Sequence, residues 1–304
     1  MAIVFKSKEK FLLIDTSYVF HARISSSFKT YMETFHDLPY PKEYIHTYDW
    51  TTNEEFMSIL KQSAANTFKY LMAKYKVSPQ NTILAVDCSR KDIWRKKIYQ
   101  EYKDNRDVTP EEQEGEPNFA QVWVYIRSQL LFDICSKQGC KLVKNKYCEG
   151  DDIIAIATSF IRENYGTDAK ITIFASDSDL TQLYDGDNFI IEDLMGENVV
   201  EKTKAKYNID DLSHLMKIKE LSGDKKDNVP QAFKGIGPVK ALKMINDKDF
   251  YDKTEKLNPN GEVIRKKNRV LLDFNCIPLP IKESVKQELK QIYKIESTGD
   301  LDGI

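Results

Sequence analysis

The chain has 304 residues, of which 41% are hydrophobic and 30% are charged, with a formal net charge of −2 at pH 7. This composition supports a sizeable core and excludes disordered, collagen-like and low-complexity proteins. The longest apolar runs, such as TILAV and IIAIA, fall far short of the roughly 20 residues that cross a bilayer, and the start of the chain lacks a signal peptide pattern. The five cysteines form no CxxC pair, which is typical of reduced thiols. We therefore expect a cytoplasmic protein that is neither secreted nor membrane-bound.

Apolar strands alternate with helices along the first two thirds of the chain. The predicted strands lie at 11–15, 82–87, 140–143, 170–176, 189–193 and 198–202. Helical spacing of apolar residues marks 54–75, 119–137 and 151–164, and the chain from 210 onward is mostly helical. The aromatic-rich stretch 28–50 is expected to belong to a long insertion between Asp15 and the first helix, to pack on the surface and to have no assigned function; its rings are Tyr31, Phe35, Tyr40, Tyr44, Tyr48 and Trp50. This alternation predicts an α/β fold with a mostly parallel central sheet flanked by helices, in which ligands bind beyond the carboxyl ends of the strands.

Acidic side chains gather at those strand ends. Asp15, Asp87 and Asp177 each follow a predicted strand, and further candidates lie in YCEGDD, SDSD and GDKKD, namely Glu149, Asp151, Asp152, Asp179, Asp224 and Asp227. Each alone could cap a turn or a helix, but together they place many like charges at one sheet edge, which is costly without cations. Magnesium accepts hard oxygen ligands, and two ions about 4 Å apart can hydrolyse a phosphodiester.

A basic segment follows Asp87. The stretch SRKDIWRKKIYQEYKDNR interleaves cations with aromatic residues. If it is helical, Arg95, Tyr99 and Lys103 share one face, with Arg106 one turn further. A solvated surface helix is the plain alternative, whereas a phosphodiesterase would use such cations for steering and such rings for stacking on unpaired bases. The acidic stretch 107–117 that comes next is predicted to be a mobile loop.

A second basic element lies in the helical part of the chain. GIGPVKALKMI begins with a tight turn at Gly235 and Gly237 and continues into a helix that carries Lys240 and Lys243. The pattern resembles a helix-hairpin-helix, in which turn amides and a helix N-terminus hold a backbone phosphate without reading sequence.

Taken together, these landmarks resemble the structure-specific 5′ nuclease (flap endonuclease) superfamily, and most closely its T-even phage ribonuclease H group. LLIDTS, ILAVD with IWRKKIYQEYKDNR, YCEGDDIIA, FASDSDLTQL, LSGDKKDNVP and GIGPVKALKMI occur in the order of that family, over about residues 11–281. The resemblance implies a catalytic α/β domain at 1–205 with a flexible helical arch at about 88–120. It also implies a helical DNA-binding lobe at 206–304 that carries the helix-hairpin-helix (helix-3-turn-helix).

The resemblance also implies roles for the acids and the basic residues. One metal would be bound by Asp15, Asp87, Glu149 and Asp151, and a second by Asp177, Asp179 and Asp227, with Asp152 and Asp224 behind them. Arg95 and Lys103 would project from the arch toward the scissile phosphate, and Tyr102 and Arg106 would help to hold the strand. DNA would also be bound by Gly235, Gly237, Lys240 and Lys243. The cofactors would be two Mg²⁺ ions, for which Mn²⁺ can substitute, with K⁺ as a further candidate at the helix-hairpin-helix.

The implied function is a metal-dependent 5′→3′ exonuclease and flap endonuclease with ribonuclease H activity, which removes RNA primers during phage-type lagging-strand replication. The implied partners are DNA with a 5′ flap, nick or fork, RNA–DNA hybrids, a single-strand-binding protein and a sliding clamp, with the enzyme a monomer in the cytoplasm, that of the host if phage-encoded. Two alternatives remain. A non-catalytic binder of branched DNA would keep the fold, and a haloacid-dehalogenase-type phosphatase would use Asp177 as its nucleophile but leave Asp15, Asp87 and Glu149 idle.

Overall fold

A five-stranded sheet forms the centre of the computed structural model, which describes residues 9–36, 47–106 and 117–295. The strands run in the order β3-β2-β1-β4-β5, and every pair of neighbours is parallel. Their bounds are β1 Lys10–Asp15, β2 Thr82–Val86, β3 Lys141–Lys144, β4 Lys170–Phe174 and β5 Phe189–Glu192. The order reverses between β1 and β4, which is where open parallel sheets bind their ligands. The predicted fold class is confirmed.

Alternating side chains of the strands build two cores. In β1, Phe11 and Leu13 contact one hydrophobic cluster, whereas Leu12 and Ile14 contact another. Both faces of the strand are fully buried, as a near-continuous apolar sequence predicts for a parallel sheet with helices on both sides.

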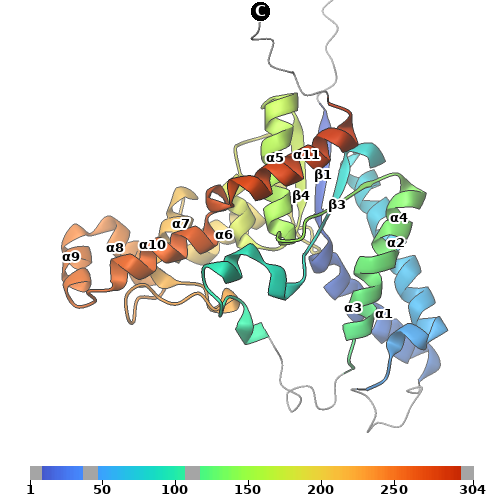
Figure 1. Cartoon of the computed structure of the whole chain (residues 1–304), viewed down its shortest axis with the longest axis horizontal. Coiled ribbons are helices and arrows are strands. Elements are labelled where there is room, and N and C mark those ends of the chain that lie inside the picture. Colours follow the sequence, from blue (N-terminus) through green and yellow to red (C-terminus); the bar gives the residue numbers. More distant parts are fainter. Residues whose placement is uncertain (1–8, 37–46, 107–116, 296–304) are drawn as a thin grey trace, which may run out of the picture.

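Helices cover both faces of the sheet (Figure 1). One face is covered by α1 Thr16–Phe35, α2 Glu54–Tyr75, α3 Ala120–Tyr125 and α4 Leu131–Gln138. The other is covered by α5 Gly150–Tyr165, α6 Val199–Tyr207 and α11 Leu279–Tyr293. A π-helical segment, Ile126–Leu130, joins α3 to α4, so the predicted helix at 119–137 is present with a local widening.

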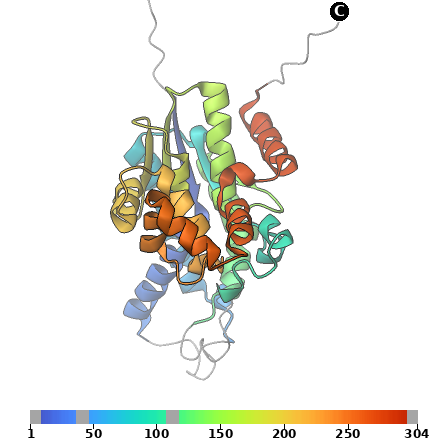
Figure 2. The ribbon, with the colours of Figure 1, turned by 90° about the vertical axis from the view of Figure 1, so that its left-hand side faces the viewer.

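A separate group of helices stands beside the carboxyl edge of the sheet. It contains α7 Ser213–Ser222, α8 Pro238–Asn246, α9 Lys248–Lys256 and α10 Gly261–Leu272, packed around Phe233. A Cβ at Gly261 would lie 2.2 Å from the Phe233 ring, so glycine permits the close approach of α10. Figure 2 views these helices in front of the sheet. After them, α11 returns to the sheet, where Val285 and Leu289 join the core formed with α5.

Three expectations about local structure were wrong. Residues 198–202 do not form a strand, because Asn198 caps the N-terminus of α6 with its side chain. A helix, α1, begins directly after β1, so the chain has no long insertion before its first helix. In the aromatic-rich stretch, Tyr31 and Trp50 are buried in the core rather than on the surface, while residues 37–46 lie outside the described part. Within the described residues, no helix combines the length and apolar character needed to cross a membrane.

Candidate metal centre

The carboxyl ends of three strands bring acids to one cavity. Asp15 ends β1, Asp87 follows β2, and Asp177 lies three residues after the end of β4. All three line a cavity of about 480 Å³, together with Glu149 and Asp151 from the start of α5. Sequence reasoning therefore placed these acids correctly at one edge of the sheet.

The first turn of α5 holds the tightest group of carboxylates. Glu149 and Asp152 form a reciprocal capping box, in which each side chain accepts a hydrogen bond from the other's backbone N–H. Glu149, Asp151 and Asp152 each offer an oxygen atom, and these atoms lie within 4.8 Å of one another. No other group of three or more acids, histidines or cysteines in the described ranges is this close.

Glycine at position 150 allows α5 to approach Asp15 and Asp87. Its backbone N–H donates to Asp87 Oδ1 at 2.6 Å. A Cβ there would lie 3.2 Å from the same oxygen and 3.8 Å from Asp15 Oδ1, so a larger residue would press on the acids. The helix start and the two strand ends thus form one acidic surface.

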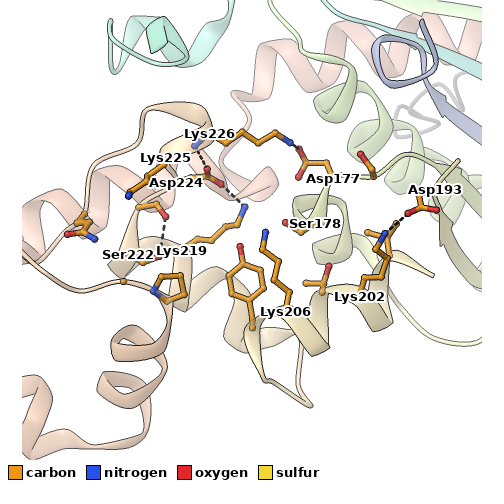
Figure 3. A pocket seen from close by; sticks show the side chains of 18 residues that line it. Asp177, Ser178, Asp193, Lys202, Lys206, Lys219, Ser222, Asp224, Lys225 and Lys226 are labelled. Atoms are coloured by element: carbon orange, nitrogen blue, oxygen red, sulfur yellow. Dashed lines mark hydrogen bonds and ion pairs between the residues drawn. The ribbon is translucent and has the colours of Figure 1, made fainter. Parts of the chain in front are cut away.

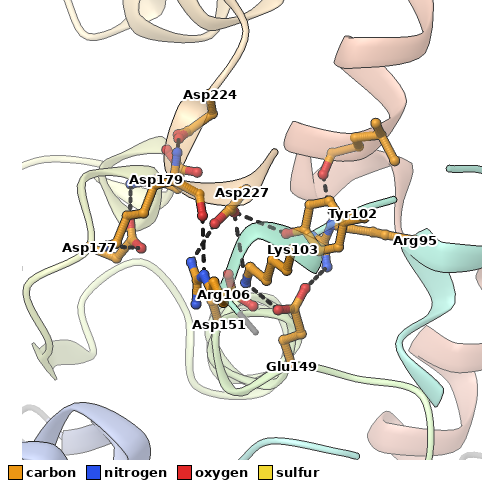
Figure 4. A network of polar contacts seen from close by, with 12 residues as sticks. Arg95, Tyr102, Lys103, Arg106, Glu149, Asp151, Asp177, Asp179, Asp224 and Asp227 are labelled. Carbon is orange, nitrogen blue, oxygen red and sulfur yellow. Dashed lines mark hydrogen bonds and ion pairs between the residues drawn. The ribbon is translucent and has the colours of Figure 1, made fainter. Parts of the chain in front are cut away.

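The remaining acids form two smaller groups (Figure 4). Asp179 and Asp224 share Lys219, whose ammonium contacts Asp179 and lies 2.8 Å from Asp224 Oδ2. Asp227 faces the other way, toward Lys103 and Arg106. Of the acids predicted for the second metal, Asp177 lines the cavity, whereas Asp179 and Asp227 do not and pair with different cations. Lys219, which is 3% exposed, was not predicted, because a lysine in a helical segment such as KIKELSGD gives no sequence signal of burial.

The basic segment after Asp87 differs from the prediction. Residues 90–106 form three short 3₁₀ turns, Arg90–Asp92, Trp94–Lys97 and Asp104–Arg106, rather than a continuous helix. Arg95 and Lys103 therefore do not project from one exposed helical face. The rest of the predicted arch, 107–116, lies outside the described residues.

Arg95 is buried against the carboxylates of Glu149 and Asp152 and does not project into the cavity from an arch. Its guanidinium binds both oxygens of Asp152 at 2.8 Å and lies 3.0 Å from Glu149 Oε2, and its Nε donates to the Leu271 carbonyl at 2.6 Å. The Trp94 indole N–H also donates to Asp152, at 3.0 Å. The expectation that Arg95 meets the substrate phosphate was wrong, because the side chain is 2% exposed and fully engaged with protein groups.

Tyr102, Lys103 and Arg106 converge on Asp227. The Tyr102 hydroxyl donates to Asp227 Oδ2 at 3.0 Å, and Arg106 pairs with Oδ1. Lys103 has φ of 60°, and its ammonium contacts Glu149 and lies 3.7 Å from Asp227. Because the Tyr102 ring is buried, it cannot stack on a base as the sequence suggested. The basic segment is thereby fastened to the connection between α7 and α8.

Crowding and burial change the pKa values of the acids. Burial and the neighbouring Asp87 raise the pKa of Asp15 to about 7. Burial together with Glu149 and Asp152 raises the pKa of Asp151 well above its ordinary value. Burial also raises the pKa of Asp179 to about 6, although Lys219 opposes the shift. Burial and neighbouring negative charge therefore oppose ionisation of these carboxylates, and a bound cation would favour it.

The donor set fits a hard divalent cation. Every candidate ligand is a carboxylate oxygen, which suits Mg²⁺ and Mn²⁺, and no described cysteine or histidine belongs to the group. The candidate metal ligands are Asp15, Asp87, Glu149, Asp151, Asp177, Asp179 and Asp227.

The predicted hairpin lies outside this cavity. Gly235 has φ of 77°, and Gly237 precedes α8, as the tight turn requires. Lys240 and Lys243 are exposed on α8, and Lys243 lies over the Phe250 ring.

Comparisons with known proteins point in one direction. Residues 42–211 match the family described as 5′-3′ exonuclease, N-terminal resolvase-like domain. A 5′-3′ exonuclease of Buchnera aphidicola subsp. Schizaphis graminum is 28% identical over 222 residues, which cover 71% of this chain and 71% of that protein. T5 5′-exonuclease with bound zinc matches the fold with a TM-score of 0.65 at 17% identity, over 93% of this chain and 99% of that chain. Bacteriophage T5 flap endonuclease, in a complex with DNA and metal ions, gives a TM-score of 0.65 at 17% identity over 94% and 100% of the two chains.

Proposed function

This chain belongs to the 5′-3′ exonuclease family, and on that premise we propose that it is a Mg²⁺-dependent 5′ nuclease that hydrolyses phosphodiester bonds. The observation that carries the proposal is the convergence of carboxylates from β1, β2, β4 and the start of α5 on one cavity. Buried carboxylates in such number favour a bound cation, and cationic side chains lie around them.

Two groups of acids would hold the metal ions. Asp15, Asp87, Glu149 and Asp151 are proposed for the first ion, and Asp177, Asp179 and Asp227 for the second. Asp152 and Asp224 would orient their neighbours through Arg95 and Lys219. Bound Mg²⁺ supplies Lewis-acid stabilisation of a phosphodiester and a water of lowered pKa.

The protein side chains have separate proposed tasks. Lys103 would meet the negative charge that a phosphodiester gains under attack, and the position of its ammonium at the cavity, beside Glu149 and Asp227, supports this role. Arg95 is a positioning residue that fixes the carboxylates of Glu149 and Asp152. Arg106, which is partly exposed beside the same cavity, would contact a strand that enters it.

The proposed substrates are branched DNA and RNA–DNA hybrids. The enzyme would act as a 5′→3′ exonuclease and a flap endonuclease at flaps, nicks and forks, and would remove RNA primers as a T-even-type ribonuclease H. Gly235, Gly237, Lys240 and Lys243 would hold duplex phosphates, with K⁺ as a candidate ion at that turn. The enzyme would be a monomer and would act in the cytoplasm, which is the host cytoplasm if the protein is encoded by a phage. Its protein partners would be a single-strand-binding protein and a sliding clamp.

The sequence predicted a nuclease domain at 1–205 and a helical lobe at 206–304, and we propose this division with an earlier end for the lobe. The separate hydrophobic cluster around Phe233 supports a lobe, and it contains residues from Tyr207 to Ile264. α11 packs on the sheet core, so the lobe would end before this helix.

The alternatives make different predictions. The phosphatase alternative is disfavoured, because the family match includes the strand that delivers Asp177. A non-catalytic DNA binder would bind branched DNA and would not respond to EDTA.

A time course separates these possibilities. Flap, nicked and RNA–DNA substrates labelled at the 5′ end are incubated with the chain in Mg²⁺, in Mn²⁺ and in EDTA. We expect cleavage with either metal and none with EDTA. Asp151→Asn should abolish cleavage while branched-DNA binding remains, and wild-type turnover of this variant at millimolar Mg²⁺ would show that the metal assignment is wrong.

A further inference from the structure

A second cavity adjoins the acidic centre (Figure 3). Its volume is about 720 Å³, and it shares Ser176, Asp177 and Lys226 with the first cavity. From there it extends along α6 to Gly237 and Pro238 at the start of α8. The two cavities therefore form one continuous path from the candidate metal ligands to the hairpin turn.

Lysine side chains dominate this second cavity. The described residues that line it include five lysines and three aspartates, namely Lys202, Lys206, Lys219, Lys225, Lys226, Asp177, Asp193 and Asp224. The net charge of these side chains is therefore positive, and such a hollow attracts a polyanion.

The lysines differ in how far their charges are already compensated. Lys202 lies 2.7 Å from Asp193 Oδ2 and 2.6 Å from Glu197 Oε2, and Lys219 and Lys226 also contact aspartates. Lys206 and Lys225 are exposed and have no acidic partner in the parts of the chain that the structure describes. Figure 3 shows Lys206 pointing into the cavity from α6. Its charge is therefore available to a ligand.

The lining favours a sugar-phosphate backbone over unpaired bases. Among the described residues that line the cavity, Tyr207 is the one aromatic residue, and the uncharged polar side chains are hydroxyls such as Ser178 and Thr203 and the amide of Gln231. Surfaces that bind single strands use several rings for stacking, whereas duplex backbones are held by cations, hydroxyls and amides.

We propose that α6 forms a second wall of the duplex-binding surface, with Lys206 contacting a backbone phosphate of DNA that runs from the acidic centre toward α8. This inference rests on the proposed nuclease function. The DNA contact from α6, a helix that covers the sheet, would be additional to the phosphate contact expected from the hairpin turn before α8.

The salt dependence of binding tests this proposal, because each phosphate contact contributes about 0.9 to the slope of log K against log salt. Anisotropy is measured in EDTA with a fluorescent 5′-flap duplex and with its single strand, from about 50 to 200 mM KCl. Lys206→Ala should lower the slope for the duplex by about one contact, so that the fourfold salt increase weakens its binding about 3.5-fold less than it weakens wild-type binding. The slope for the single strand should not change.

Lys204→Ala is the matched control. Lys204 lies on the same helix, pairs with Glu201 and does not line the cavity, so its removal should leave the slope unchanged. A wild-type slope for Lys206→Ala, an equal change on the single strand, or an equal change in Lys204→Ala would overturn the inference. Mg²⁺-dependent cleavage by the unmodified chain is measured in parallel: its absence refutes the proposed nuclease, whereas an altered duplex slope still supports the α6 contact.

Discussion

Truncation of Arg95 should destabilise the fold, and not only slow a reaction. The guanidinium joins Asp152 and Glu149 on α5 to the Leu271 carbonyl at the end of α10, and it stacks on the Trp94 ring at 4.6 Å. Arg95→Ala would leave two buried carboxylates with less positive charge and one buried carbonyl without its donor. Removal of one partner from a buried ion pair costs about 3–5 kcal/mol. This range includes the loss of the hydrogen bond to the Leu271 carbonyl, because that bond belongs to the same network and its energy is not additive with the ion pairs.

This loss can be measured by urea unfolding in EDTA, where no added metal compensates the acids. We expect the free energy of unfolding to fall by about 3–5 kcal/mol, and the melting temperature to fall by about 6–10 °C at about 2 °C per kcal/mol for a chain of this size. The control is Arg127→Ala, because Arg127 is exposed and its guanidinium lies over the Trp123 ring at 5.5 Å. It should change stability by about 1 kcal/mol or less. A loss below about 1 kcal/mol for Arg95→Ala would refute the view that Arg95 holds the acids in place.

Three further outcomes follow from the same geometry. Lys103→Ala should slow single-turnover cleavage at saturating enzyme by about tenfold or more, equivalent to about 1.4 kcal/mol of barrier, and an unchanged rate would make Lys103 a mere tether. Replacing Lys240 and Lys243 with alanine should weaken duplex binding and flatten its salt dependence, and an unchanged slope would leave the hairpin a structural turn. Without metal, the pKa of Asp15 is raised from 3.8 to about 7 and that of Asp179 from 3.8 to about 6. At pH values between the ordinary and the raised pKa, these two groups bind more protons in the folded chain than in the unfolded chain. Its melting temperature in EDTA should therefore fall as pH rises through this range, and Mg²⁺ should raise the melting temperature more at about pH 7.5 than at about pH 5.5; an equal Mg²⁺ effect at both values would contradict the assignment.

The sequence alone determined the sheet and the identity of its acidic edge. The short apolar runs ending at Asp15 and Asp87 predicted buried strands, and the carboxyl ends of parallel strands share one edge. The start of α5 was also predicted from the sequence, because Asp151 and Asp152 precede an apolar helical segment. These features depend on local periodicity and on residue type, which a sequence displays directly.

Tertiary packing decided the rest, because charged side chains have no pattern that reveals their partners. Arg95 and Lys103 have helical spacing, yet contacts with Glu149 and Asp227, distant in sequence, fold their segment into 3₁₀ turns beneath the acids. Lys219 sits in an ordinary helical sequence but is buried between Asp179 and Asp224, because each of these side chains lowers the cost of burying the others. Such long-range pairings compensate buried charge in the folded chain. They cannot be predicted from local propensity, because propensity depends only on neighbouring residues.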